Sequence, residues 1–437
     1  MARRVRMLAV VLGVLGAAVL AASCGTKTAR PTVNKTDVRI QSERVRELAL
    51  KREFEYKDRL NRLGYLLRHA NADLCGRKTV RSLGVSIDSA ENLAPDWRPT
   101  VATVMGITSD QPSIFAVAPG SPGDKAGLRV GDEILTYNGR SVPSGEAGRK
   151  DLREWMYQDF RRTAKDDAKT GADNATAADK QTEKAADKDA DKAAAQPESA
   201  LAVPEVDATP TPFVKPANAL DPVTVQLGVR RRGLISYIDV QAEAVCRYPL
   251  VLVYTDEVNA CADGKVIYVN TGLLRLLTDD GQLMLILGHE MAHNVMGHIE
   301  QDKQNVALGQ LADAIVTFFT GGPSGAFTDA SRMVNDANSI PMEEEADYVG
   351  LYFSARTGTD ISHVRELWEL MAVEHPGAIG RPGTDHPMDE FRSLFLEKTV
   401  AEIEAKRAQG QPLVPNIQEG ATAPWDADDD NATSEEP

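Results

Sequence analysis

Two stretches of the chain place apolar residues where helices need them. In residues 41–74 they recur three, four and seven positions apart, which predicts an amphipathic helix. The apolar positions of this stretch are Val45, Leu48, Leu60, Leu63, Leu67, Ala70 and Leu74. The second stretch, residues 283–287, is apolar at every position and is therefore expected to lie in a buried helix.

Between these helices the pattern changes to short apolar segments separated by turns. Residues 113–118 predict a strand that ends in a Pro-Gly turn, and a short helix is expected to close at Gly127. Residues 131–135 predict another strand, and the Asn138–Gly139 pair after it favours a tight hairpin. The pattern stops near Arg162 and resumes at residues 223–230, which predict a closing strand.

Two polar segments interrupt or follow these elements. Residues 164–216 are rich in Ala, Asp and Lys and bury too little apolar surface to offset chain entropy, so a disordered insertion is expected. An isolated helix is the alternative, although Asp, Asn, Thr and Gly lower its propensity. The acidic end of the chain, residues 408–437, is also expected to be disordered. No internal repeat is found.

The N-terminus has the features of an export signal. Arg3, Arg4 and Arg6 precede an apolar run, residues 8–22, that is short for a membrane span. Small residues then lead to Cys24, which resembles a bacterial lipoprotein signal in which residues 1–23 are removed and Cys24 is lipidated. A plain secretory peptide is the alternative. Gly25 after the cysteine favours the outer membrane, with the protein facing the periplasm.

Charge limits the partners of the exported chain. Removal of the three arginines lowers the formal net charge from −15 to −18. A chain this acidic argues against nucleic-acid binding and against holding anionic lipid by net charge, so membrane attachment is expected through acyl chains.

Three further cysteines allow one disulfide in an oxidising compartment. Cys75 and Cys246 are the preferred pair, because they end the first helical region and begin the next apolar segment. Cys261 would then be a buried free thiol, although three pairings remain open.

The strongest chemical signal is the HExxH motif formed by His289, Glu290 and His293. Histidines four residues apart on a helix differ by about 40° of rotation and lie on one face. Two neutral imidazoles so placed can bind one Zn²⁺, and zinc lowers the pKa of bound water. Glu290 would then act as the catalytic base. The alternative is a pair of core histidines beside a chance glutamate.

A third metal ligand is expected about fifty residues later. Pro341 suggests a helix start there, and Glu343, Ala346, Asp347 and Gly350 share one face of that helix. The small Ala346 and Gly350 would let this helix approach the HExxH helix closely. Glu343 could then reach the metal and Asp347 could orient a ligand imidazole. Acidic residues that only complement the helix dipole are the alternative, and Glu344 and Glu345 are expected to be solvated.

These residues resemble the HtpX and CAAX-prenyl-endopeptidase family of gluzincin zinc metalloproteases, and more closely its periplasmic BepA-like branch. The resemblance implies that His289, His293 and Glu343 bind one Zn²⁺, that Glu290 is the base and that Asp347 supports a ligand. It also includes residues 258–264, similar to the family's substrate edge strand. It therefore implies substrate binding at Asn259 and Ala260, and also at Arg392, which follows an Asp-His-Pro segment.

Two other histidines need separate interpretation. His298 lies five residues after His293, about 140° around a continuous helix, and is expected to be structural. His386 belongs to the Asp-His-Pro segment, where the resemblance implies a place near the cleft as a catalytic residue. It could stabilise the oxyanion or cover the metal. His69, His363 and His375 have no partner motif.

The turn-rich region resembles a PDZ domain of the bacterial protease-associated type. Its AGL, GDEIL and NG segments, residues 126–139, carry the resemblance, and a simple hairpin is the alternative. PDZ domains bind an extended peptide at a sheet edge, so a PDZ peptide ligand is expected. Residues 105–107 are the nearest candidate for a carboxylate-binding loop.

Together these features predict an α+β protein, with a mainly helical zincin-like peptidase domain and an inserted, small β-barrel-like PDZ domain. The expected parts are the signal peptide 1–23, a helix at 40–75, the PDZ domain at 80–242, the peptidase core at 243–407 and the tail. The expected function is zinc-dependent hydrolysis of protein or peptide substrates in envelope quality control. Alternatives are a PDZ scaffold or assembly chaperone with a latent peptidase, and a regulator that cuts one defined partner.

Overall fold

The computed structural model describes residues 31–93, 95–161, 223–304, 327–374, 390–423 and 425, with only the backbone at 161, 327–339 and 390–391. The signal peptide, Cys24, the insertion 164–216 and His386 lie outside these residues. The chain divides into two units, residues 1–49 and residues 50–437, and helix α2 (Lys35–Ala70) contributes to both. Among the described helices, none has the length and apolar character that a membrane crossing requires.

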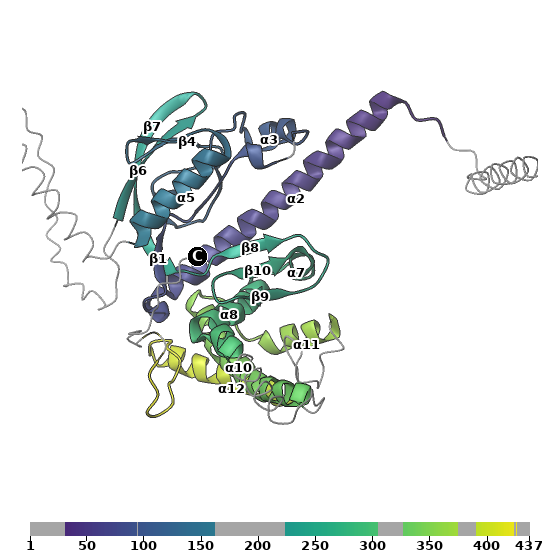
Figure 1. Cartoon of the computed structure of the whole chain (residues 1–437). Helices are drawn as coiled ribbons and strands as arrows, with labels where there is room; N and C mark the ends of the chain where they lie inside the picture. Colours follow the sequence, from purple (N-terminus) through teal and green to yellow (C-terminus); the bar gives the residue numbers. More distant parts are fainter. Residues whose placement is uncertain are drawn as a thin grey trace, which may run out of the picture. The chain divides into compact units, whose positions relative to one another are not determined.

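The expected α+β class is confirmed, because the second unit holds a β-rich domain and a mainly helical domain (Figure 1). The β-rich domain is a sheet in the order β1-β7-β6-β4-β3-β2, with β5 paired to β4. Its strands are β1 (Thr79–Ser82), β2 (Val85–Asp88), β3 (Ser113–Val117), β4 (Glu133–Tyr137), β5 (Arg140–Ser141), β6 (Val223–Arg231) and β7 (Leu234–Cys246).

Helices complete this domain on one face of the sheet and beside it. Helix α5 (Gly145–Arg161) places Leu152 and Phe160 in a core with Ile134, Leu227 and Val240 from the strands. The short α4 (Pro122–Lys125) begins at Ser121, whose side chain accepts a hydrogen bond from the Asp124 amide. The connection from β2 to β3 adds η2 (Ala90–Asn92) and α3 (Arg98–Met105).

The hairpin expected at Asn138–Gly139 is present between β4 and β5. Both residues have positive φ, 49° and 76°, and Tyr137 pairs with Arg140 across the turn. This is the backbone that a two-residue type I′ turn requires, and Asn-Gly is its preferred sequence. The closing strand expected at 223–230 is β6, which pairs antiparallel with both β4 and β7.

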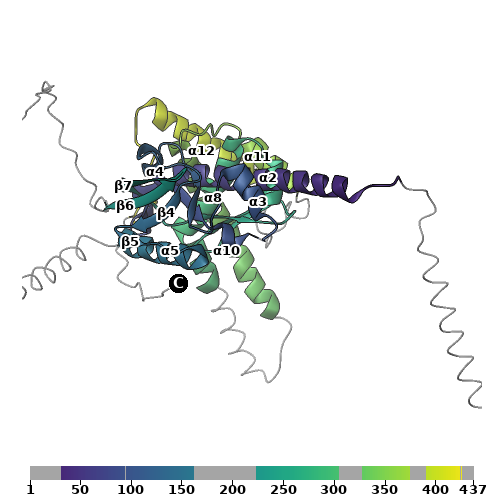
Figure 2. The ribbon, with the colours of Figure 1, turned by 90° about the horizontal axis from the view of Figure 1, so that it is seen from above.

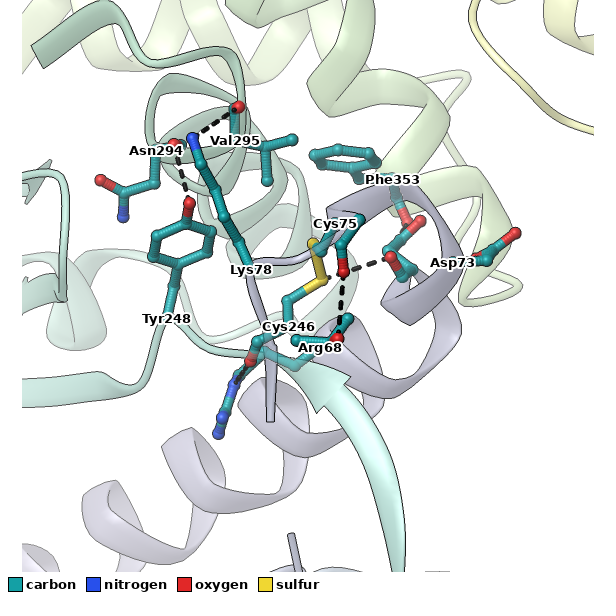
Figure 3. Close-up of a disulfide and its surroundings, with 12 residues drawn as sticks. Arg68, Asp73, Cys75, Lys78, Cys246, Tyr248, Asn294, Val295 and Phe353 are labelled. Carbon is teal, nitrogen blue, oxygen red and sulfur yellow. Dashed lines mark hydrogen bonds between the residues drawn. A yellow bond between two sulfur atoms is a disulfide. The ribbon is translucent and has the colours of Figure 1, made fainter. Parts of the chain in front are cut away.

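A disulfide joins the two points where the chain enters and leaves the β-rich domain. Cys75 ends η1 (Ala72–Cys75), directly after α2, and Cys246 ends β7; their Cα atoms are 5.6 Å apart. Around it, Arg68 donates from Nε to the Cys246 carbonyl at 2.6 Å, and Lys78 donates to the Val295 carbonyl at 3.4 Å (Figure 3). The preferred cysteine pair is therefore the one that is bonded.

Cys261 is a correction to the sequence analysis, which expected it to be buried. It lies on the three-residue strand β9 (Ala260–Ala262) with its side chain exposed. The alternation of side chains along a strand explains this, because Ala260 on the other face is buried.

Removing the disulfide should lower the stability of the protein. We expect the double variant Cys75→Ala/Cys246→Ala to lose about 2–4 kcal/mol of unfolding free energy, because a cross-link between residues 171 positions apart constrains the unfolded chain. Urea unfolding followed by circular dichroism measures this loss. Cys261→Ala, at an exposed position, is the control and should leave the midpoint unchanged; an unchanged midpoint in the double variant would contradict the prediction.

The helical domain is built on a small sheet in the order β8-β10-β9. Strands β8 (Leu250–Val253) and β10 (Ile267–Asn270) are parallel, and β9 runs antiparallel to β10. The helices are α7 (Thr271–Leu276), α8 (Asp280–Met296), α10 (Phe327–Arg356), α11 (Val364–Glu374) and α12 (Glu390–Ala408). Helices α8 and α10 pack side by side, as Figures 1 and 2 both show.

Two glycines bring α8 and α10 into backbone contact. A Cβ atom on Gly350 would lie 2.7 Å from the backbone N and Cα of His289, and one on Gly288 would lie 2.6 Å from the Gly350 carbonyl oxygen. Ala346, expected to permit this close approach, is fully buried. Helix α10 begins at Phe327, however, so Pro341 lies inside the helix and not at its start.

The segment after α12 also differs from the expected disordered tail. Lys406 donates to the Val414 carbonyl at 2.7 Å, and the Asn416 amide group donates to Glu402 at 2.9 Å. Trp425 is buried against the core of the helical domain, and its backbone lies so near Gly76 that a Cβ atom there would be 2.6 Å from the Trp425 carbonyl oxygen. Residues 409–423 are therefore held by hydrogen bonds and by one large apolar side chain near the end of the chain.

Candidate metal centre

Helix α8 places both histidines of the HExxH motif in the interior. Its first turn is capped by the Asp279 side chain, which accepts from the Gln282 amide at 2.9 Å, and every residue from 283 to 295 is buried. The rings of His289 and His293 lie edge to face with centroids 4.7 Å apart. Glu290 between them is 2% exposed. The predicted buried helix and the shared face of the two imidazoles are both present.

Glu343 from α10 completes a three-residue donor set. One of its oxygens lies 3.2 Å from Nε2 of His293 and the other 3.5 Å from Nε2 of His289, while the two Nε2 atoms are 3.1 Å apart. The three donor atoms all lie within 4.8 Å of one another. Two imidazole nitrogens and one carboxylate converging in a buried space match the donor set of a catalytic zinc site. The residues present therefore fit a divalent metal.

Asp347 lies beside Nδ1 of His289, on the side of the ring away from the donor set. Its Oδ1 lies 2.9 Å from Nδ1 of His289, which leaves Nε2 of that ring facing the donor set. A carboxylate in this position fixes the orientation and tautomer of a ligand histidine. The place proposed for Asp347 from its spacing on α10 is the place it occupies.

Arg392, on α12, lies beside the buried carboxylates of the donor set and of Asp347. It is 3% exposed, contacts Asp347 through Nε at 2.5 Å and through Nη2 at 2.9 Å, and lies 3.2 Å from Glu343. Its guanidinium also stacks over Trp368, 4.4 Å from the ring centre. Two buried carboxylates need a cation beside them, and Arg392 supplies it. The substrate-binding role implied by the resemblance stays a prediction.

The electrostatics of the two histidines differ. Burial, together with His289 and His298, lowers the pKa of His293 to about 4 despite the nearby Glu343, so its neutral form prevails at neutral pH. Burial also disfavours charged His289, but Asp347 and Glu343 outweigh it and raise the pKa of His289 to about 10. Burial would raise the pKa of Asp347, yet Arg392 and His289 hold it below its ordinary value. Metal binding would therefore release a proton from His289.

His298 is buried and hydrogen-bonded, as expected of a structural histidine, but it does not point away from the metal site as the helix geometry suggested, because it lies beside a proposed metal ligand. Its Nδ1 lies 3.1 Å from Nδ1 of His293, and its Nε2 lies 2.9 Å from the carboxylate of Glu345. The prediction assumed a continuous helix. Helix α8 ends at Met296, and Gly297, with φ of 77°, turns the chain so that His298 comes back beside His293.

These two contacts determine which ring nitrogens of His293 and His298 carry a hydrogen. If Nε2 of His293 faces the metal, its Nδ1 carries a hydrogen and donates to Nδ1 of His298. Nε2 of His298 then carries a hydrogen and donates to Glu345. Glu345, expected to be solvated, is half exposed, so this series of hydrogen bonds ends at the protein surface. Sequence spacing alone misses both residues, and the glycine directly before His298 is the signal that could have indicated the turn.

Loss of this contact should weaken metal binding. We expect His298→Phe to raise the metal dissociation constant about 10- to 100-fold, the usual effect of removing a partner of a ligand histidine. His298→Asn, which can accept from His293 and donate to Glu345, should show a smaller effect. Competition with a chromogenic chelator measures both, and His363→Asn, at an exposed histidine, is the control. Equal affinity in all three variants would show that His298 does not position His293.

The sheet edge implied for substrate binding is strand β9. Asn259 and Ala260 lie where this strand begins, and β9 pairs only with β10 among the described residues. Asn294 of α8 fixes the turn after β9, because its Oδ1 accepts from the Gly264 amide at 2.7 Å and its Nδ2 donates to the Val266 carbonyl at 3.3 Å. Sequence reasoning missed Asn294, a buried polar residue of the motif helix that directly follows His293.

The PDZ-like domain has a sheet edge at β2, and the candidate carboxylate-binding loop, residues 105–107, lies at the end of α3. Those residues end α3, where Gly106 has φ of 72° and Ile107 is buried in a cluster with Val101. Strand β2 pairs only with β3 among the described strands and has α5 nearby, since Arg149 lies 4.0 Å from Asp88. A peptide that extends the sheet has a free edge at β2.

Comparisons with known proteins agree with these features. Residues 230–383 match the model of Peptidase family M48, and residues 114–163 match a PDZ domain model. The chain is 28% identical over 152 residues to metalloprotease LoiP of Escherichia coli K12, which covers 33% of this chain and 60% of LoiP. It is 26% identical over 151 residues to mitochondrial metalloendopeptidase OMA1 of Schizosaccharomyces pombe, 33% of this chain and 44% of OMA1.

A further match is 31% identical over 149 residues to metalloendopeptidase OMA1 of Homo sapiens, 30% of this chain and 28% of that protein. The matches thus span less than two thirds of each of these relatives. The chain carries a PDZ domain and an M48 peptidase domain, and the comparisons support a metalloendopeptidase.

Proposed function

We propose that this chain, with its M48 peptidase domain and its PDZ domain, is a zinc-dependent endopeptidase of the bacterial cell envelope. The observation that carries the proposal is the convergence of His289, His293 and Glu343 on one buried point, from two helices in glycine contact. The motifs further favour the periplasmic BepA-like branch of the family. Its substrates would be misfolded or stalled envelope proteins.

In the proposed reaction His289, His293 and Glu343 would hold the ion, which when bound would supply Lewis-acid polarisation of the substrate carbonyl and lower the pKa of water. Glu290 accepts the proton of the attacking water and returns it to the leaving amine. Asp347 and Arg392 keep His289 and Glu343 in place, and His298 does the same for His293. The substrate would lie extended along β9, beginning at Asn259 and Ala260, and the walls of the buried site exclude bulk water. His386 is proposed as a second catalytic residue.

The location is proposed from the N-terminal sequence. Lipidation of Cys24 after removal of residues 1–23 would anchor the protein to the outer membrane, facing the periplasm. The disulfide between Cys75 and Cys246 supports an oxidising compartment, where such bonds persist. The PDZ domain would bind a peptide ligand at β2 and deliver substrate or control access to the cleft.

Removing the metal should abolish the activity reversibly. We expect a chelator to stop cleavage of a fluorescently labelled unfolded protein, and stoichiometric Zn²⁺ to restore it, because all three donors serve one ion. Elemental analysis of the purified protein should give about one zinc per chain. His293→Ala should lose both the metal and the activity. A protein that contains no divalent metal, or that cleaves equally well after chelation, would rule out the proposed function.

A further inference from the structure

The end of the PDZ sheet at the β6–β7 turn exposes an unusual number of large apolar side chains. All six residues from 232 to 237 are exposed, and among them Leu234 is 78%, Ile235 59% and Tyr237 66% exposed. Figure 1 shows this turn at the upper end of the domain. Exposed apolar residues are common singly, but a cluster of this kind marks an interaction site.

The residue at the first position of the turn, Arg232, is not the one that best stabilises this backbone. Arg232 and Gly233 form a two-residue turn between paired Arg231 and Leu234, and their φ values are 51° and 82°. The equivalent β4–β5 turn in the same sheet has Asn138 and Gly139, with φ of 49° and 76°. Asn adopts positive φ more readily than Arg, so the arginine at this position is not explained by the backbone. Strain of this kind points to a role for the side chain.

A second segment adds to the same end of the sheet. Arg231 bonds to Asp132 through Nε at 2.6 Å and donates to the Gly127 carbonyl at 2.7 Å, which holds the loop 127–132 beside the turn. This loop exposes Arg129 and Val130, the latter 47% exposed. We call Arg129, Val130, Arg232, Leu234, Ile235 and Tyr237 the tip surface.

The charge of the tip surface is positive although the whole chain is acidic. Arg230 is paired with Glu133 and Arg231 with Asp132. Arg129 and Arg232 are exposed and form no ion pair within the described ranges. The tip surface therefore presents two uncompensated cations beside four apolar side chains.

The apolar side chains lie on both faces of a thin ribbon. Side chains alternate along β7, so Leu234 lies on the face that also carries buried Val240, whereas Ile235 and Tyr237 lie on the other face. A protein partner docking on the sheet would contact one face. If the end of the hairpin entered a fluid apolar phase, that phase would contact both faces of the ribbon.

From this geometry we propose that the tip surface inserts into the surface of an anionic lipid bilayer. Leu234, Ile235 and Val130 would enter the boundary between head groups and acyl chains, Tyr237 would lie at the level of the head groups, and Arg129 and Arg232 would pair with lipid phosphates. The proposal requires neither the metal site nor lipidation of Cys24. It gives the PDZ domain a fixed orientation to the membrane.

A fluorophore placed at the turn tests this directly. The full chain carrying Cys24→Ser and Cys261→Ser receives Ser236→Cys, and the thiol is labelled with a polarity-sensitive dye. The matched control carries the label through Ser141→Cys, beside the β4–β5 turn, where the residue is also exposed. Both proteins are mixed with phosphatidylcholine vesicles, without or with about 30% phosphatidylglycerol as the anionic lipid.

The expected result is a blue-shifted, brighter signal at position 236 with the anionic vesicles and no change at position 141. Leu234→Ser with Ile235→Ser should weaken this binding about tenfold or more, because the apolar area that enters the bilayer is lost. Arg232→Asn, which keeps the turn, should weaken binding to the anionic vesicles.

An unchanged signal at position 236 would overturn the proposal. Equal binding to both vesicle types, unaffected by Arg232→Asn, would overturn the recognition of anionic lipid. If Leu234→Ser with Ile235→Ser instead converts an oligomer to a monomer and vesicles have no effect, the tip surface joins two copies of the chain, and the proposal is wrong.

Discussion

Replacing Glu290 with glutamine is expected to lower the turnover of an unfolded protein substrate by about 10²- to 10⁴-fold, the usual contribution of a general base. Glutamine has nearly the same shape but cannot accept the proton of the attacking water. Because Glu290 is outside the donor set of His289, His293 and Glu343, the variant should keep its metal. Single-turnover kinetics and elemental analysis on the same preparation measure the two effects separately.

Glu366→Gln, which removes an exposed carboxylate on α11, is the matched control and should leave turnover unchanged. Glu290→Gln should also retain bound substrates, which mass spectrometry can identify from cells that produce the variant. If this variant complements a deletion strain as well as the native protein does, the scaffold or chaperone alternative is favoured over the peptidase. Turnover within a factor of two of the native value would exclude Glu290 as the base.

Replacing Gly350 with alanine is expected to damage the metal site without altering any ligand. The added Cβ would lie 2.7 Å from backbone atoms of His289, and backbone cannot move aside as a flexible side chain can. Helix α10 must therefore shift away from α8, which moves Glu343 and Asp347 relative to the histidines. Overpacking of this kind costs about 1–3 kcal/mol of stability. Chelator competition should show weaker metal binding, and urea unfolding a lower midpoint.

Gly281→Ala on α8 is the matched control for this prediction. Gly281 is also helical, but its added Cβ would meet only side-chain atoms of Asp279 and Thr359 at 3.0 Å and 3.8 Å. Alanine is the better helix former, but Oδ1 of Asp279, which caps α8, must move slightly to admit the added Cβ. The control is therefore judged by metal affinity, which Gly281→Ala should retain because no backbone atom of α10 has to move. If Gly350→Ala retains native metal affinity, the glycine contact does not position Glu343.

Local patterns in the sequence were sufficient for the central part of the site. The spacing in the HExxH motif placed His289 and His293 on one face, and the small residues Ala346 and Gly350 indicated which helix carries the third donor. Both signals are periodic and lie within single helices. The hairpin at Asn138–Gly139 was equally local, because its turn type depends on two residues.

The features that sequence reasoning missed depend on contacts between distant segments or on single turns. Arg392 reaches Asp347 and Glu343 across α12 and α10, and no spacing rule encodes that approach. One left-handed residue, Gly297, redirects His298 toward the metal ligands. Trp425 packs against residues that are distant from it in the sequence. Composition alone therefore suggested disorder for a segment that the structure holds in place.

The disulfide has a further consequence for how this architecture can be rebuilt. Because Cys75 and Cys246 lie 5.6 Å apart at their Cα atoms, the chain departs for the β-rich domain and returns at almost the same point. A deletion of residues 76–245 could therefore be closed by a short linker without stretching the remaining protein. The same junction would accept a different module, so the recognition domain of this molecule is exchangeable in a way that its hydrolytic half is not.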